Sequence, residues 1–145
     1  MYAYGYFIIE VTNMATREQV TLIKEFFLIT KLSPYVIYLF GSQASSQTHS
    51  ESDFDIAFIS EQEVDTYERF MISQELAAAL NKDVDLIDLD KASTVFQAQI
   101  ITSGVLLYCS DESKRILFEM YTLKKYAKLN EEREEILQKH DKESH

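Results

Sequence analysis

The feature that most constrains the fold is a pair of strand-like segments on either side of a polar loop. The run Tyr35-Val36-Ile37-Tyr38-Leu39-Phe40 is apolar throughout, as expected for a central strand covered on both faces. It ends at Gly41-Ser42, and after ten polar or small residues a second segment begins with Asp53-Phe54-Asp55 and then becomes apolar. The chain is therefore expected to leave a buried strand through a tight turn and to return in a strand that starts with two carboxylates.

The remaining segments predict a sheet flanked by helices. Helical periodicity and strand-like alternation assign helices from Thr16 to before Pro34, over 63–81, over 94–102 and from Asp111 onward, and strands over 83–89 and 105–109. The expected fold class is α/β (α+β), with a small sheet of about four strands and a long C-terminal helix. That last helix presents an apolar stripe of Ile116, Met120, Leu123 and Ala127, while Phe118, Tyr121 and Tyr126 are interpreted as core or partner contacts.

Length and composition indicate one domain. A chain of 145 residues with 46% hydrophobic content can bury one core. Residues 14–145 are expected to form this single domain, with a charged C-terminal tail, and residues 1–13 an upstream start or an extra edge strand. The first residues lack the features of a signal peptide, and no apolar run approaches the ~20 residues that span a bilayer, so no membrane association is expected.

Charge and cysteine content narrow the function classes. The 24 acidic against 14 basic residues give a formal charge of −10, which would repel a phosphate backbone, so direct nucleic-acid binding is not expected. Such a surface suits either a basic protein partner or solubility alone. The single cysteine, Cys109, cannot form an internal disulfide and fits a reducing cytoplasm.

Three aspartates on two predicted strands form the candidate metal site. Asp53 and Asp55 are two residues apart and so project from the same face of their strand. A neighbouring strand can place Asp85 across from them, and the repulsion among three carboxylates is relieved by divalent cations. Ligands that are all oxygen favour Mg²⁺, which binds protein carboxylates together with substrate phosphates.

Gly41 and Ser42 form the candidate phosphate site. Glycine permits a tight turn after the strand and close approach of a triphosphate to the backbone. The amide and hydroxyl of Ser42 can donate hydrogen bonds to phosphate oxygens.

The sequence resembles the nucleotidyltransferase superfamily with a polymerase-beta-like core, whose motif is Gly-Ser, a spacer and Asp-x-Asp. Gly41, Ser42, Asp53 and Asp55 match the motif, and Asp85 matches the family's third carboxylate. The resemblance extends over about 16–140 to the minimal (MntA-type) antitoxins of the HEPN/MNT toxin–antitoxin systems. It implies a mixed sheet in a nucleotidyltransferase fold. It also implies a cytoplasmic, Mg²⁺-dependent enzyme that transfers AMP from ATP to a tyrosine of a cognate HEPN ribonuclease toxin, with which it assembles as a hetero-oligomer.

The resemblance also assigns roles to individual residues. Asp53 and Asp55 would hold two Mg²⁺ ions, while Asp85 would complete the shell of the second ion and accept the proton of the nucleophile. Gly41 and Ser42 would fix the β- and γ-phosphates. Many relatives carry Arg and Gly where this chain has Ser45 and Ser46, a difference that leaves the carboxylates intact but bears on turnover.

Two other functions fit the same residues. The chain could be an antitoxin that only masks its toxin, with a vestigial nucleotide site, or an enzyme that transfers a nucleotide to a small molecule. The intact aspartates favour catalysis over masking, and the chain offers little room for a separate small-molecule domain. Three further aspartates, Asp83, Asp88 and Asp90, are interpreted as solvated charges at the strand edge, and His49 as an exposed loop residue.

Overall fold

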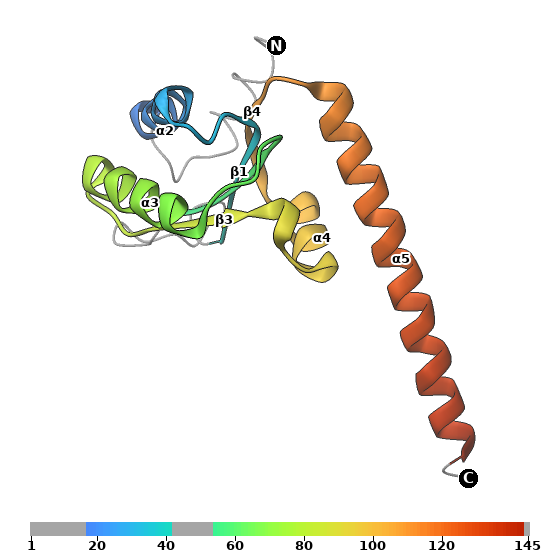
Figure 1. The fold of residues 1–145 in the computed structure, drawn as a ribbon. Coiled ribbons are helices and arrows are strands. Elements are labelled where there is room, and N and C mark those ends of the chain that lie inside the picture. The colour runs from blue at the N-terminus through green and yellow to red at the C-terminus, as the bar shows by residue number, and fades with distance from the viewer. Residues whose placement is uncertain (1–16, 42–53, 144–145) are drawn as a thin grey trace.

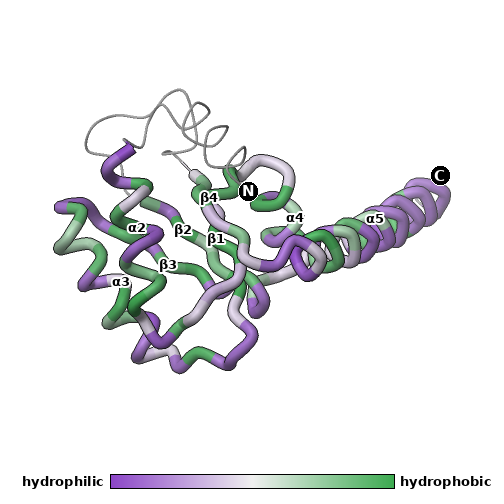
Figure 2. Tube along the Cα trace, turned by 90° about the horizontal axis from the view of Figure 1, so that it is seen from above, coloured by the Kyte–Doolittle hydropathy of each residue, from purple (hydrophilic) through white to green (hydrophobic). Residues whose placement is uncertain are grey.

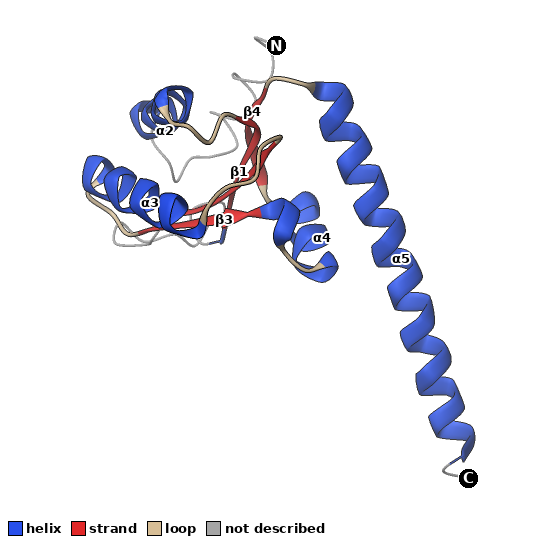
Figure 3. Ribbon diagram, viewed as in Figure 1, coloured by secondary structure: helices blue, strands red, loops and turns tan. Residues whose placement is uncertain are grey.

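The computed structural model describes residues 17–41 and 54–143. Within these ranges the chain forms four α-helices, a short 3₁₀-helix and a four-stranded sheet (Figures 1 and 3). In chain order the elements are α2 (Arg17–Ile29), β1 (Pro34–Phe40), β2 (Phe54–Ser60), α3 (Thr66–Leu80), β3 (Val84–Asp88), η2 (Leu89–Lys91), α4 (Thr94–Ser103), β4 (Val105–Cys109) and α5 (Glu112–Glu143). The expected fold class, including the long C-terminal helix, is confirmed.

The sheet is mixed and has the strand order β3-β2-β1-β4. Strand β1 pairs antiparallel with both β2 and β4, whereas β2 and β3 are parallel. The central position predicted for the apolar run is confirmed, since β1 lies between two partners and five of its seven residues are buried. Strand β3, predicted from its charged alternation to lie nearer an edge, is one of the two edge strands, and β4 is the other.

Helices α2 and α3 cover one face of the sheet. Val20, Ile23 and Phe27 of α2 and Leu76 of α3 pack with Phe54, Ile56 and Phe58 of β2 in one core cluster. Helix α3 begins where the carboxylate of Asp65 accepts a hydrogen bond from the amide of Tyr67, and it ends at Asn81 in the left-handed conformation. Both ends lie inside the predicted range 63–81.

Helices α4 and α5 lie on the other face of the sheet (Figure 1). There Val36 and Tyr38 of β1 and Ala57 and Ile59 of β2 pack with Ile100 of α4. Helix α4 starts at Ser93, whose hydroxyl accepts from the amide of Phe96 at 3.2 Å, and it ends at Gly104 as expected. Figure 2 shows α5 extending away from this body, with hydrophilic residues predominant toward its C-terminal end.

Several expectations concern residues outside the described ranges. The proposed extension 1–13 and the loop between β1 and β2 are among them, so the assignment of residues 14–145 to one domain stays a prediction. Within 17–41 and 54–143, every helix is too short or too polar to cross a membrane.

Candidate functional site

The candidate site lies at the end of the sheet where β1 ends and β2 and β3 begin. Because β2 runs antiparallel to β1, Phe40 at the end of β1 is the register partner of Asp55 near the start of β2. Because β3 runs parallel to β2, its first residues reach the same end, and Asp55 is in register with Asp85. Two of the three predicted carboxylates are therefore neighbours on adjacent strands.

Strand alternation sets the face on which these carboxylates project. Phe54 and Leu86, the neighbours of Asp55 and Asp85 along their strands, are buried in the core under α2 and α3. Successive side chains of a strand point to opposite faces. The two carboxylates therefore project from the face that carries α4 and α5, with Asp55 half-buried and Asp85 exposed. This confirms the expectations that Asp85 lies across from Asp55 and that Phe54 packs behind.

Gly41 brings the turn directly against the carboxylate of Asp55. Its φ is +74°, in the left-handed region that glycine adopts readily. A Cβ on Gly41 would collide with Oδ2 of Asp55 and would lie 3.0 Å from its Cγ. Only a residue without a side chain lets the backbone and this carboxylate come so close.

Two of the predicted site residues, Ser42 and Asp53, fall outside the described ranges. The same is true of three other residues of that loop, Ser45, Ser46 and His49. In the described part of the chain, no three His, Cys, Asp or Glu side chains gather closely enough to hold a metal ion. The structure thus brings together Gly41, Asp55 and Asp85, while the positions of Ser42 and Asp53 stay predictions.

The donor set of this pair fits a magnesium ion. Asp55 and Asp85 offer only oxygen ligands, and they sit at a strand end where Asp85 is open to solvent. Mg²⁺ retains several waters and takes one or two protein carboxylates together with substrate phosphates. Two adjacent carboxylates with solvent access are compatible with that coordination.

An aromatic pair that belongs to none of the sequence motifs lies beside the carboxylates. The rings of Phe40 on β1 and Phe96 on α4 meet edge to face, with centroids 5.7 Å apart. Phe40 is the register partner of Asp55, so this pair borders the same end of the sheet. No local signal identifies Phe96, because its position depends on how α4 packs on the sheet.

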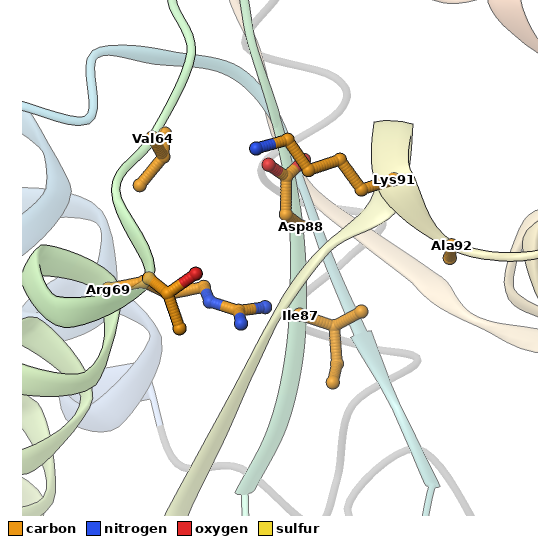
Figure 4. A pocket seen from close by; sticks show the side chains of 7 residues that line it. Val64, Arg69, Ile87, Asp88, Lys91 and Ala92 are labelled. Carbon is orange, nitrogen blue, oxygen red and sulfur yellow. The ribbon is translucent and has the colours of Figure 1, made fainter.

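The environment of Asp88 differs from the one expected from the sequence. The prediction that Asp88 is a solvated strand-edge charge is wrong, since its exposed fraction is 9%. It lines a cavity of about 260 Å³ with Val64, Arg69 and Lys91, and Figure 4 shows the last two side chains extending into that cavity. Burial raises the pKa of the Asp88 carboxyl, and attraction by Lys91 and Arg69 offsets part of this rise.

Comparisons with known proteins identify a family and a relative that this chain resembles over the residues of the candidate site. The family model for polymerase beta nucleotidyltransferases matches residues 22–113, a range that contains Gly41, Asp55 and Asp85. The protein adenylyltransferase MntA of Shewanella oneidensis is 40% identical over 102 residues, which are 70% of this chain and 73% of MntA.

Two solved structures are similar along most of the chain. One is a toxin–antitoxin crystal structure with AMP-PNP, at a TM-score of 0.73 and 35% identity, covering 83% of this chain and 96% of the other. The second is the tri-AMPylated Shewanella oneidensis HEPN toxin in complex with the MNT antitoxin. It has a TM-score of 0.70 and 33% identity, and the match covers 85% of this chain and 96% of the other. With a family match over more than half its length and a relative of this identity, the chain belongs to the polymerase beta nucleotidyltransferase family.

Proposed function

We propose that this chain is the antitoxin of a toxin–antitoxin pair and that it transfers AMP from ATP to a tyrosine hydroxyl of its cognate HEPN ribonuclease toxin. The observation that carries the proposal is the contact of the Gly41 turn with Asp55, which is itself in register with Asp85. The similar proteins support it, since one is a protein adenylyltransferase and two are complexes containing AMP-PNP or a tri-AMPylated toxin.

The turn at Gly41 and the carboxylates bind different parts of the metal–nucleotide substrate. The backbone at Gly41, with the amide and hydroxyl of Ser42, binds the β- and γ-phosphates. Asp53, Asp55 and Asp85 would hold two magnesium ions. Bound there, magnesium would neutralise phosphate charge and lower the pKa of the attacking hydroxyl. The assignment of Asp53 and Ser42 rests on the sequence alone.

The transfer step breaks one bond and forms another. The tyrosine oxygen of the toxin attacks the α-phosphorus, the bond between this phosphorus and the bridging oxygen breaks, and pyrophosphate leaves. The proton of the hydroxyl passes to Asp85, which is exposed next to Asp55. Gly41 contributes by keeping the phosphates in line, because no side chain separates the backbone from Asp55.

We place this reaction in the cytoplasm. The proposed substrate ATP is made there, and the lone Cys109 suits a reducing compartment.

The decisive experiment compares Asp55→Asn with the wild-type chain and with Asp90→Asn. Each variant removes one carboxylate charge, but Asp90 lies in η2, beyond the opposite end of β3 from Asp85. Each chain is mixed with the purified toxin, Mg²⁺ and ATP labelled in the adenine or the α-phosphate. We expect Asp55→Asn to keep the fold and toxin binding but to lose label transfer by more than about 100-fold, since it removes a metal ligand.

The alternative functions give different results in the same assay. Neutralisation of the toxin by Asp55→Asn as efficient as by wild type, without any label on the toxin, would indicate an antitoxin that only masks its target. If an aminoglycoside is added to the mixture, label that appears on it and not on the toxin would indicate a small-molecule nucleotidyltransferase.

A further inference from the structure

Helix α5 is covered by the rest of the protein only along its first half. The residues that pack on the body recur every three or four positions: Arg115, Phe118, Glu119, Thr122 and Tyr126 are all at least partly buried, and Thr122 is 1% exposed. Beyond Asn130 every described residue of the helix is exposed. Figure 1 shows this second half projecting past the body.

Two contacts define the direction of the projection. Lys114, in the first turn of α5, lies 5.4 Å from the ring centroid of Tyr35 at the start of β1. Glu119 accepts a hydrogen bond of 2.7 Å from the hydroxyl of Tyr38, further along the same strand. Helix α5 therefore advances beside β1 in the same direction, toward the end of the sheet where Gly41, Asp55 and Asp85 lie.

The length of α5 takes it well beyond that end. At 1.5 Å per residue, the 21 steps from Thr122 to Glu143 extend about 30 Å. The carboxylates of Asp55 and Asp85 project from the face of the sheet on which α4 and α5 lie. The free half of α5 and the candidate catalytic residues thus share one side of the molecule.

The free half carries an apolar face that continues the covered one. Steps of three, four or seven residues from Thr122 lead through Leu129 to Ile136, and Leu137 is adjacent. Ile136 and Leu137 are 67% and 65% exposed. The opposite side of this segment bears Glu131, Glu134 and Glu135. Ile136 and Leu137 therefore lie, with Arg133 and the half-buried Leu129, on the side of α5 that turns toward the sheet, and these three glutamates lie on the outer side.

We propose that Leu129, Ile136 and Leu137 form the surface on which the HEPN toxin docks, so that its acceptor tyrosine is held at the Asp55–Asp85 end of the sheet. The inference rests on the proposed function, because it takes the toxin as the protein acceptor. Transfer to a protein requires that the acceptor be bound beside the reacting phosphate, and this surface lies on the side where binding would achieve that.

Charge favours the toxin over a second copy of this chain as the occupant. Segment 131–143 carries six carboxylates against three Lys and Arg side chains, in a chain of net charge −10. Pairing two such segments would bring like charges together. A ribonuclease, in contrast, needs basic groups to bind RNA, so it offers charges that complement this segment.

The test compares two double variants of the full chain with matched losses of apolar surface. Ile136→Ala/Leu137→Ala truncates the proposed docking surface. Leu117→Ala/Met120→Ala is the control, since these residues are 67% and 64% exposed but lie on the outer side of the covered half. Alanine preserves helix propensity, and thermal unfolding verifies that each variant folds. Binding to the purified toxin and the kinetics of AMP transfer are then measured for both.

We expect Ile136→Ala/Leu137→Ala to weaken toxin binding about tenfold or more and to raise KM for the toxin with little change in kcat. The control should stay within about twofold of wild type. Equal binding by both variants and wild type would overturn the docking surface, even if transfer is normal. A dimer of this chain alone, seen by sedimentation and lost in Ile136→Ala/Leu137→Ala, would also overturn it.

Failure of the proposed function gives a separate pattern. If wild type binds the toxin through Ile136 and Leu137 but transfers no AMP, the docking surface stands and the catalytic proposal falls. If wild type transfers AMP to the toxin without depending on these residues, the catalytic proposal stands and the docking surface falls.

Discussion

At the scale of single residues, Gly41 is the position where backbone conformation and the candidate chemistry meet. Its positive φ disfavours a side chain, and its contact with the Asp55 carboxylate leaves no room for one. A non-glycine residue in the left-handed region costs roughly 1–2 kcal/mol, which a folded domain tolerates. Displacement of the carboxylate has the larger effect, because catalysis depends on its position.

Gly41→Ala is therefore predicted to affect transfer more than stability. The added Cβ forces the Asp55 carboxylate to move, and a displacement of about 1 Å can cost roughly 100-fold in rate. We expect AMP transfer to fall by about that factor while the free energy of unfolding falls by only ~1–2 kcal/mol. Radiolabel transfer and urea unfolding measure the two quantities.

Gly104→Ala provides the contrast. A Cβ there would lie 2.6 Å from the carbonyl oxygen of Ile100, so this variant should lose stability. The residues that surround it are not those of the candidate site, and transfer per folded molecule should be close to wild type. Loss of stability without loss of transfer in Gly41→Ala would contradict the role given to Gly41.

Burial of Asp88 changes the pKa of its carboxyl and the way this group contributes to stability. Its pKa is raised in the folded chain, mainly because burial disfavours the charged form. A folded-state pKa above the unfolded one means that the folded state binds the proton more tightly. The contribution of Asp88 to stability is therefore most favourable at low pH, and it is lost as pH rises through the folded pKa.

Asp88→Asn is accordingly predicted to be slightly more stable than wild type at pH 7.5. A rise in Tm of about 1–3 °C corresponds to a fraction of a kcal/mol for a chain of this size. The difference should shrink as the pH is lowered, because the wild-type carboxyl then takes up its proton. Thermal unfolding of both chains at several pH values tests this, and a variant that is less stable at pH 7.5 would show that the attraction of Lys91 and Arg69 outweighs burial.

At the scale of elements, a polar cluster joins α5 to the sheet. The hydroxyl of Tyr38 donates to Glu119 at 2.7 Å, and Arg115 donates to both carboxylate oxygens of Glu119 at 3.1 Å. Burial and the hydrogen bond to Glu119 raise the pKa of Tyr38, so its hydroxyl stays protonated and remains a donor over the physiological range. This cluster sets the position of the helix along β1.

Tyr38→Phe is predicted to lower the free energy of unfolding by about 1–2 kcal/mol, since it removes a hydrogen bond to a charged acceptor and leaves the ring in place. Urea unfolding measures the loss. Combined with Glu119→Gln in a double-mutant cycle, the two changes should be less than additive, because they remove the same interaction. Fully additive effects would mean that the two side chains do not stabilise α5 together.

At the scale of the whole molecule, one face of the sheet carries the larger core and the other carries the candidate site. Helices α2 and α3 bury the larger core cluster on one face. The other face carries α4, the first half of α5 and the Asp55–Asp85 pair. The free half of α5 projects past the body (Figure 1). One face thus provides most of the stabilising burial, while the other holds the candidate chemistry and the proposed docking surface.

The sequence predicted the elements well and the contacts between them less well. Strand alternation was enough to place Asp55 on one face with Phe54 behind it, because the direction of a side chain on a strand depends only on its position. For α5, periodicity identified the stripe of Ile116, Met120 and Leu123 but not that it is exposed. The helix instead packs through a face with Arg115 and Glu119, because Tyr38, far away in sequence, supplies a hydrogen-bond partner there.

The sequence by itself determined which residues share a face of each strand or helix, and which residue types could hold phosphate and metal. The tertiary structure decided that Asp55 and Asp85 are in register, that Asp88 is buried, and which side of α5 is covered. The physical reason is the range of the interactions. Backbone periodicity acts over a few residues, whereas register and burial depend on hydrogen bonds and packing between segments tens of residues apart.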